Sequence, residues 1–179
     1  MRNRVRIVGG EWRSRWLQFP ALPGLRPTPD RVRETLFNWL GQDLTGRVCL
    51  DLFAGSGALG LEAASRGAKL AVLVERDPRV YRALETSVRA LDARNVQLVR
   101  ADALEFLAAD ARAYDVVFLD PPYAMREQGP LLGAVRVRLA PGALVYLESS
   151  EFASLPALWE MVRQTRAGAV HCQLMRGAS

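Results

Sequence analysis

The sequence predicts an α/β protein, with a doubly wound, mostly parallel sheet and an N-terminal β-hairpin extension. From residue 47 onward, short runs rich in valine and leucine alternate with segments of helical spacing. Such alternation is typical of a parallel sheet covered by helices on both faces. A glycine-rich turn follows the first of these runs, where sheets of this kind bind ligands. Upstream lies an arginine-rich segment with strand-like alternation around Gly9-Gly10.

The first 17 residues are predicted to form the hairpin, because two alternating runs flank Gly9-Gly10. Side chains alternate between the faces of a strand, so the arginines of each run share a face. The arginines expected to bind RNA there are Arg2, Arg4, Arg6, Arg13 and Arg15. Trp12 and Trp16 lie among them and suit either base stacking or packing onto the body.

The remaining elements follow from spacing and turn residues. A proline-rich linker covers residues 20–29, and Thr28-Pro29 is expected to cap a helix that ends at Gly41. Strands are expected at residues 47–53, 70–75, 96–100, 115–120 and 143–148. Helices are expected at 58–66, 79–91, 103–110, 130–139 and 155–163, before a closing hairpin at 165–175. We therefore divide the chain into a basic hairpin with its linker (1–29) and a ligand-binding domain (30–179).

Composition limits the possible functions. The chain has 179 residues, half of them hydrophobic, with no apolar run long enough for a membrane span. Its first residues lack the apolar region of a secretory signal, so a cytoplasmic location is expected. Two cysteines and one histidine are too few for a disulfide framework or a Cys/His metal site. Chemistry is thus expected from carboxylates, backbone groups or a cofactor.

The charge is unevenly distributed. Residues 1–33 hold eight arginines and two acids, a net charge of +6, whereas the rest of the chain carries −1. A basic N-terminal segment on a nearly neutral body is typical of an arm that binds a polyanion. We expect this arm to be separable from the body. The alternative is a structural flap that covers the ligand through its tryptophans.

The glycine-rich turn admits two ligands. Gly55-x-Gly57-x-x-Gly60 fits the dinucleotide fingerprint, and Glu75 is placed to accept hydrogen bonds from ribose hydroxyls. The same pattern fits an S-adenosyl compound. Asp51, at the end of the first strand, favours the latter, because a carboxylate suits an ammonium group better than a diphosphate.

A second motif, Asp120-Pro121-Pro122-Tyr123, follows the fourth strand. The prolines fix the backbone and leave carbonyls that can accept hydrogen bonds from an exocyclic amino group. The carboxylate of Asp120 can accept another, and the ring of Tyr123 offers a face on which a base can stack. This motif predicts a site for a nucleobase.

These residues resemble a known family. Asp120–Tyr123 is similar to motif IV of amino-directed nucleic-acid methyltransferases, and Asp51–Gly57 to their motif I. The blocks at residues 6–10, 24–28 and 30–40 resemble the RsmD family of bacterial 16S ribosomal RNA guanine-N2 methyltransferases. The resemblance extends to about Glu148 and implies a Rossmann-like class I methyltransferase fold.

The resemblance also implies roles for single residues. Those expected to hold S-adenosylmethionine are Thr28, Asp51, Gly55, Gly57, Glu75, Asp102 and Ala103. Those expected to hold the target base are Asp120, Pro121, Pro122 and Tyr123. Asp102 also suits a helix cap. The implied partner is 16S ribosomal RNA, within an assembling small subunit, with no metal and no membrane.

Three other functions remain open at this point. Adenine-N6 methylation of DNA or RNA is the nearest, because a carboxylate at position 120 favours guanine without excluding adenine. An inactive nucleic-acid-binding protein is disfavoured by the acids at 51, 75, 102 and 120. A dinucleotide-dependent oxidoreductase is disfavoured by Asp51 and by the motif at 120–123.

Overall fold

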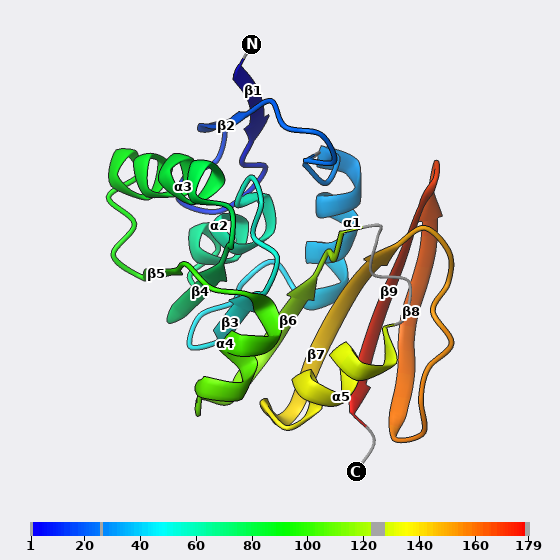
Figure 1. Ribbon diagram of the computed structural model, residues 1–179. Coiled ribbons are helices and arrows are strands. Elements are labelled where there is room, and N and C mark those ends of the chain that lie inside the picture. The colour runs from blue at the N-terminus through cyan, green and yellow to red at the C-terminus, as the bar shows by residue number, and fades with distance from the viewer. Residues whose placement is uncertain (1, 26, 123–127, 178–179) are drawn as a thin grey trace.

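The computed structural model describes residues 2–25, 27–122 and 128–177, and within them seven strands form one sheet in the order β5-β4-β3-β6-β7-β9-β8 (Figure 1). The strands are β3 (Val48–Asp51), β4 (Leu70–Val74), β5 (Val96–Val99), β6 (Tyr114–Leu119), β7 (Leu139–Ser149), β8 (Trp159–Ala167) and β9 (Val170–Gly177). The pairs from β5 to β7 are parallel, whereas β9 is antiparallel to both β7 and β8. The predicted mostly parallel sheet is confirmed.

Helices cover both faces of this sheet, as expected for a doubly wound fold. They are α1 (Asp30–Leu40), α2 (Ala58–Ser65), α3 (Pro78–Ala90), α4 (Ala103–Ala109) and α5 (Gly129–Arg136). Apolar side chains of α4 and α5 pack on one face, and those of α1, α2 and α3 pack on the other (Figure 1). No helix in the described part of the chain is long and apolar enough to span a bilayer.

The N-terminal hairpin forms, but its return strand begins later than predicted. β1 (Arg2–Arg6) pairs antiparallel with β2 (Trp16–Pro20), so Arg13 and Arg15 precede the return strand and do not share one of its faces. Gly9-Gly10 is part of the long connection between the strands and does not form a two-residue turn. The predicted turn at Gly9-Gly10 is therefore wrong.

Close contact with α2 explains the two glycines. The carbonyl of Gly9 accepts a hydrogen bond from the Ser65 hydroxyl at 2.7 Å. A Cβ on Gly9 would lie 2.2 Å from an Arg66 nitrogen, and one on Gly10 would lie 2.0 Å from the Ser65 carbonyl oxygen. Gly10 also has φ +76°, which favours glycine. The glycines thus allow the hairpin connection to reach the C-terminal end of α2.

The hairpin packs into the core by its apolar face. Its five buried side chains share one cluster with residues of α2, α3 and β4. They are Val5, Ile7, Trp12, Leu17 and Phe19. Trp12 is therefore a packing residue, whereas Trp16 on the opposite face is 53% exposed. Removal of the hairpin would expose part of this cluster to water, so the expectation of an arm that is separable from the body is wrong.

The predicted helix at 155–163 is wrong, because β8 begins at Trp159 within it. Leu155, Leu158, Trp159 and Val162 have helical spacing, which suggested a helix. Leu158 instead has φ +73°, outside the helical region, and β8 pairs with β9 along its length. The closing hairpin predicted around Ala167-Gly168 is confirmed as β8–β9. Cross-strand pairing thus overrides a weak helical pattern.

The start of α1 also differs from the expectation. Pro29 occupies the N-cap position and no side chain caps the helix. Thr28 is buried, and its hydroxyl forms a hydrogen bond with the carboxylate of Glu148, a residue distant in sequence. The predicted capping role of Thr28 is wrong, since a tertiary contact uses the same hydroxyl.

A buried ion network joins the hairpin to α1 and α2. The Glu62 carboxylate accepts hydrogen bonds from Arg33 at 3.0 Å and from Arg66 at 3.0 Å, and all three side chains are at least 95% buried. It also accepts the backbone N–H of Val8 at 2.9 Å. Arg33 in turn donates to the carbonyl of Arg6 at 2.7 Å. One carboxylate thus fixes three segments that are distant in sequence.

We predict that Glu62→Gln destabilises the protein by about 3–5 kcal/mol, because it leaves two buried guanidinium groups without their main counter-charge. Urea unfolding at pH 7 measures this difference. Asp92→Asn is the matched control, since it removes one carboxylate from an exposed pair with Arg94 and should cost at most about 1 kcal/mol. Equal stability of the Glu62 variant and wild type would contradict the role of the network.

Candidate active site

Four neighbouring strands end in acids at one edge of the sheet. Asp51 ends β3, Glu75 follows β4, Asp120 follows β6 and Glu148 lies near the end of β7. These strands are parallel, so their carboxyl ends meet. Sequence reasoning selected the first three and missed Glu148. The sequence feature that could have identified Glu148 is an acid at the end of a buried strand, as at positions 51 and 120.

The glycine-rich turn joins β3 to α2. Gly55 and Gly57 have φ +51° and +78°, and Gly57 is the N-cap of α2. A Cβ on Gly60 would lie 2.7 Å from the Leu73 side chain and 3.0 Å from the Cβ of Asp51. Glycine at 60 thus allows α2 to pack closely on the sheet. The backbone of the turn remains close to the acidic edge.

Glu75 is held against this turn. One carboxylate oxygen accepts the N–H of Gly55 at 3.0 Å, and the other accepts the N–H of Asp77 at 2.7 Å. These bonds fix the carboxylate at the end of β4. Asp77 itself caps α3, where its side chain accepts the N–H groups of Arg79 and Val80.

Asp51 is buried beneath the turn. Its carboxylate accepts the N–H of Gly60 at 2.8 Å. Burial raises the pKa of Asp51 to about 7, a rise that the Gly60 hydrogen bond opposes and the charges of Glu75 and Glu148 reinforce. A buried carboxyl group poised near neutrality is suited to a cationic ligand group.

Asp120 and Glu148 belong to the same acidic cluster. Burial raises the pKa of Asp120 well above its ordinary value, and the charges of Glu148 and Asp51 raise it further. Burial likewise raises the pKa of Glu148, opposed by hydrogen bonds from Thr28 and Tyr146 and by the charge of Arg33. The sheet edge thus carries three carboxyl groups whose pKa values are all raised by burial.

The other predicted site residues lie around this edge. Pro121 is buried and Pro122 is exposed, whereas Tyr123 lies outside the described residues. Asp102 caps α4 by accepting the N–H of Leu104 at 2.9 Å, and Ala103 is buried behind it. The capping alternative for Asp102 is therefore confirmed.

The segment before α1 lies over the glycine-rich turn. The Leu25 side chain is 3.1 Å from the position that a Cβ on Gly55 would occupy. Thr28, three residues further on, contacts Glu148. The linker thus brings its residues to both the glycine-rich turn and the acidic cluster.

These groups fit S-adenosylmethionine. Asp51 offers a buried negative charge for an ammonium group, and Glu75 offers acceptors for ribose hydroxyls. The positive φ angles of Gly55 and Gly57 shape the turn that lies between these two acids. Among the residues the structure describes, no group of three or more His, Cys, Asp or Glu side chains could hold a metal ion.

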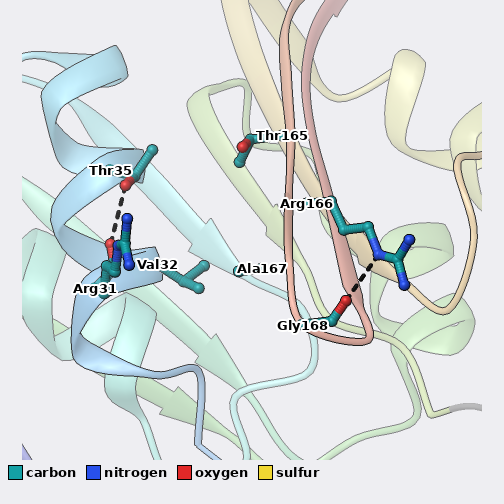
Figure 2. Close-up of a pocket in the computed structure, with 7 residues that line it drawn as sticks. All are labelled: Arg31, Val32, Thr35, Thr165, Arg166, Ala167 and Gly168. Carbon is teal, nitrogen blue, oxygen red and sulfur yellow. Dashed lines mark hydrogen bonds between the residues drawn. The ribbon is translucent and has the colours of Figure 1, made fainter.

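A cavity of about 330 Å³ lies between α1 and the end of the β8–β9 hairpin (Figure 2). Arg31, Val32 and Thr35 line it from α1, and the last three residues of β8 with Gly168 of the β8–β9 turn line it from the other side. The Arg166 side chain donates to the carbonyl of Gly168 at 2.8 Å, which braces that turn (Figure 2). Glu148 of β7 is paired with Cys172 near the start of β9, so the β8–β9 turn lies at the same end of the sheet as the acids.

The hairpin arginines form an exposed group. Those with exposed side chains are Arg4, Arg6, Arg13 and Arg15, whereas the side chain of Arg2 lies outside the described part. The Arg4 guanidinium is 4.5 Å from the centre of the Trp16 ring, a cation–π contact. This pair places an exposed aromatic ring and a guanidinium side by side on the hairpin.

Two of these arginines also support the fold. Arg6 pairs with Asp30 at 3.4 Å, and Arg15 donates to the Ala90 carbonyl at 2.9 Å. Arg4 and Arg13 are therefore the better choices for testing ligand contacts without disturbing the hairpin.

Comparison with known proteins identifies the family. A family model described as "Conserved hypothetical protein 95" matches residues 5–176. Proteins named "Ribosomal RNA small subunit methyltransferase D" from Escherichia coli K12 and Haemophilus influenzae are 45% and 39% identical, over 96% and 97% of this chain and 89% and 94% of their own lengths. The chain belongs to this RsmD family.

Solved structures agree with this assignment. A structure described as "Putative methyltransferase yhhF from Escherichia coli" matches with a TM-score of 0.87 and 42% identity, covering 99% of both chains. A precorrin-6y C5,15-methyltransferase from Geobacter metallireducens has a TM-score of 0.67 at 21% identity, over 90% of this chain and 94% of that one. The RsmD-family fold seen here is that of class I methyltransferases.

We predict that Asp51→Asn flattens the pH dependence of stability. Asp51 has a pKa of about 7 in the folded state and 3.8 as its ordinary value. The contribution of protonated Asp51 to the free energy of unfolding is therefore complete below about pH 4 and is lost as pH rises through about 7. At 1.36 kcal/mol per unit, the loss is on the order of 4 kcal/mol. Urea unfolding from pH 4 to 8.5 measures it.

Asparagine retains an acceptor for the Gly60 N–H, so the variant should fold. Its stability relative to wild type should increase with pH. The exposed Asp92→Asn serves as the control and should follow the wild-type curve. A constant difference between Asp51→Asn and wild type at all pH values would show that Asp51 ionises normally.

Proposed function

We propose that this protein transfers a methyl group from S-adenosylmethionine to the exocyclic N2 of a guanine in 16S ribosomal RNA. The names of its relatives support ribosomal RNA as substrate and methyl transfer as the reaction. The observation that carries the chemistry is the buried acidic cluster at the carboxyl edge, with Asp120 beside Asp51. Such a cluster suits one cationic ligand and one amino group.

For the cofactor, Asp51 would accept from the ammonium group and Glu75 from the ribose hydroxyls. Gly55 and Gly57 would allow the methionine portion to approach the backbone. Thr28 would lie at the amino-acid end, since its hydroxyl is fixed beside the cluster. Asp102 and Ala103 would face the adenine ring of S-adenosylmethionine.

For the base, Asp120 and the Pro121 carbonyl would accept hydrogen bonds from the amino group, with Pro122 shaping the turn and Tyr123 stacking on the ring. These acceptors favour the nucleophilic form of the nitrogen and offset its developing positive charge. When bound, S-adenosylmethionine supplies the methyl group: the nitrogen–carbon bond forms as the carbon–sulfur bond breaks, its electron pair staying on sulfur. Asp120 accepts the proton that the nitrogen loses.

Guanine is preferred over adenine for a physical reason. Guanine presents N1–H and N2–H side by side, and a carboxylate accepts both. Adenine presents its N6 amino group beside a ring acceptor, which a carboxylate would repel. Adenine-N6 methylation remains the alternative, and the identity of the methylated nucleoside distinguishes the two.

The partner is proposed to be 16S ribosomal RNA within an assembling small subunit. The exposed arginines of the hairpin would contact phosphates, and the cavity beside α1 would accommodate a nucleotide next to the target base. We propose the division at residue 29 as a functional one: residues 1–29 bind RNA and bring Thr28 to the cofactor, and residues 30–179 carry the other residues of the methyltransferase site.

We predict that Asp120→Asn lowers methyl transfer by about 10²–10³-fold while cofactor affinity stays within about twofold, because an electrostatic contact at the reacting nitrogen is lost. The assay uses purified protein with ribosomal RNA from cells that lack the enzyme, and mass spectrometry of the nucleosides. N2-methylguanosine is the expected product of wild type. Glu105→Gln, an exposed change on α4, is the control. Full turnover by Asp120→Asn would remove Asp120 from the site, and N6-methyladenosine would favour the alternative.

We predict that the Arg4→Ala/Arg13→Ala variant binds ribosomal RNA with a weaker salt dependence, while its affinity for S-adenosylmethionine is unchanged. Each lost phosphate contact should reduce the slope of log K against log salt by roughly 0.7–0.9. Salt titrations and calorimetry measure the two affinities. The control, Arg163→Ala/Arg176→Ala, removes the same charge at exposed positions on β8 and β9. Equal slopes in wild type and both variants would exclude the hairpin as a phosphate-binding surface.

A further inference from the structure

Glu148 is the acid of this edge that no role above uses. It is 5% exposed, near the carboxyl end of β7. The register pairs Leu119 of β6 with Leu147, which places Asp120 and Glu148 at the next position of adjacent parallel strands. On its other side Glu148 is paired with Cys172 of β9. It thus lies beside Asp120 in the interior of the sheet.

Hydrogen bonds from two directions hold its carboxylate. The Tyr146 hydroxyl donates to it at 3.0 Å from the same face of β7. The Thr28 hydroxyl donates to it from the segment before α1. The guanidinium of Arg33 on α1 attracts it, although Arg33 is also bonded to Glu62 and Asp30. Glu148 is therefore held in one place by contacts from β7 and from the segment before α1.

The charged and titratable groups around the pair come from every neighbouring element. The acids are Asp51 on β3, with Glu75 acting on it from β4, and Asp120 after β6. The positively charged group is the guanidinium of Arg33 on α1. The weakly acidic groups are the buried side chains of Tyr146 on β7 and Cys172 on β9. Negative charge exceeds positive charge at this edge, which favours protonation of one of its members.

We propose that Glu148 is a positioning residue: its fixed, buried carboxylate beside Asp120 makes Asp120 basic enough to accept the proton released from the target amino group. The proposal rests on the proposed function for the source of that proton. In the step, the amino nitrogen loses one N–H proton to a carboxylate oxygen of Asp120, which becomes neutral. The site then carries one fewer negative charge, and repulsion between Asp120 and Glu148 is relieved.

Glu148→Gln tests this role. The amide oxygen still accepts from the two hydroxyls, so the variant retains its contacts and loses only the charge. Carbon-13 NMR of the Asp120 carboxyl group, in protein without cofactor, should show titration shifted to lower pH than in wild type. The acid limb of the rate profile should shift the same way. Turnover on its plateau should fall several-fold, by less than the roughly 10²–10⁴-fold that loss of a general base costs.

Two variants complete the experiment. Glu148→Asp retains the charge and should restore the wild-type titration in large part. Glu151→Gln removes an exposed carboxylate three residues further on and should change neither the titration nor the rate profile. Melting temperature and S-adenosylmethionine affinity report whether each variant is folded.

The outcomes separate the two proposals. If the Asp120 titration of folded Glu148→Gln coincides with that of wild type, the role of Glu148 is overturned, whichever base is methylated. If wild type methylates another base but the titration shifts, the proposed substrate is wrong and the coupling between Glu148 and Asp120 stands.

Discussion

The carboxylate of Glu62, in the middle of α2, is the interaction on which the arrangement of the site depends. It binds two buried arginines and a backbone N–H of the hairpin connection. Arg33 extends the network to the carbonyl of Thr28, at 3.1 Å. A buried charge without partners costs several kcal/mol, so these segments are stable only when they meet at Glu62. The position of Thr28 beside the acidic edge follows from this constraint.

The same constraint links the hairpin to the chemistry. A basic arm that only bound RNA would need no buried arginine network and no place in the core. Here the hairpin contributes five side chains to the core, and the segment after it lies over Gly55. The N-terminal region therefore has two physical roles, packing through one face and exposing arginines on the other. Point substitutions on the exposed face separate them, whereas deletion does not.

Much of this could be predicted from the sequence, because local patterns and tertiary contacts agree there. The parallel strands read as continuous apolar runs, and Asp51, Glu75 and Asp120 stand at their ends. Prediction failed where a contact with a residue distant in sequence determines the local structure. Gly9-Gly10 looks like a turn but serves close packing on Ser65, and Thr28 looks like a cap but bonds to Glu148. Glu148 was missed because no motif marks it and only the register of β6 and β7 places it beside Asp120.

The position of β9 has a consequence for how the protein is made. Among the strands of the described residues it comes last in sequence, yet it lies between β7 and β8 in the sheet. During synthesis on the ribosome, β7 therefore has an unpaired edge until residues 170–177 emerge. Such an edge is prone to pair with another chain. Cys172 is also the β9 residue that pairs with Glu148, so the acidic edge is completed only once β9 has been synthesised. A nascent chain stalled before residue 170 would hold its glycine-rich turn but lack the final neighbour of its acidic cluster.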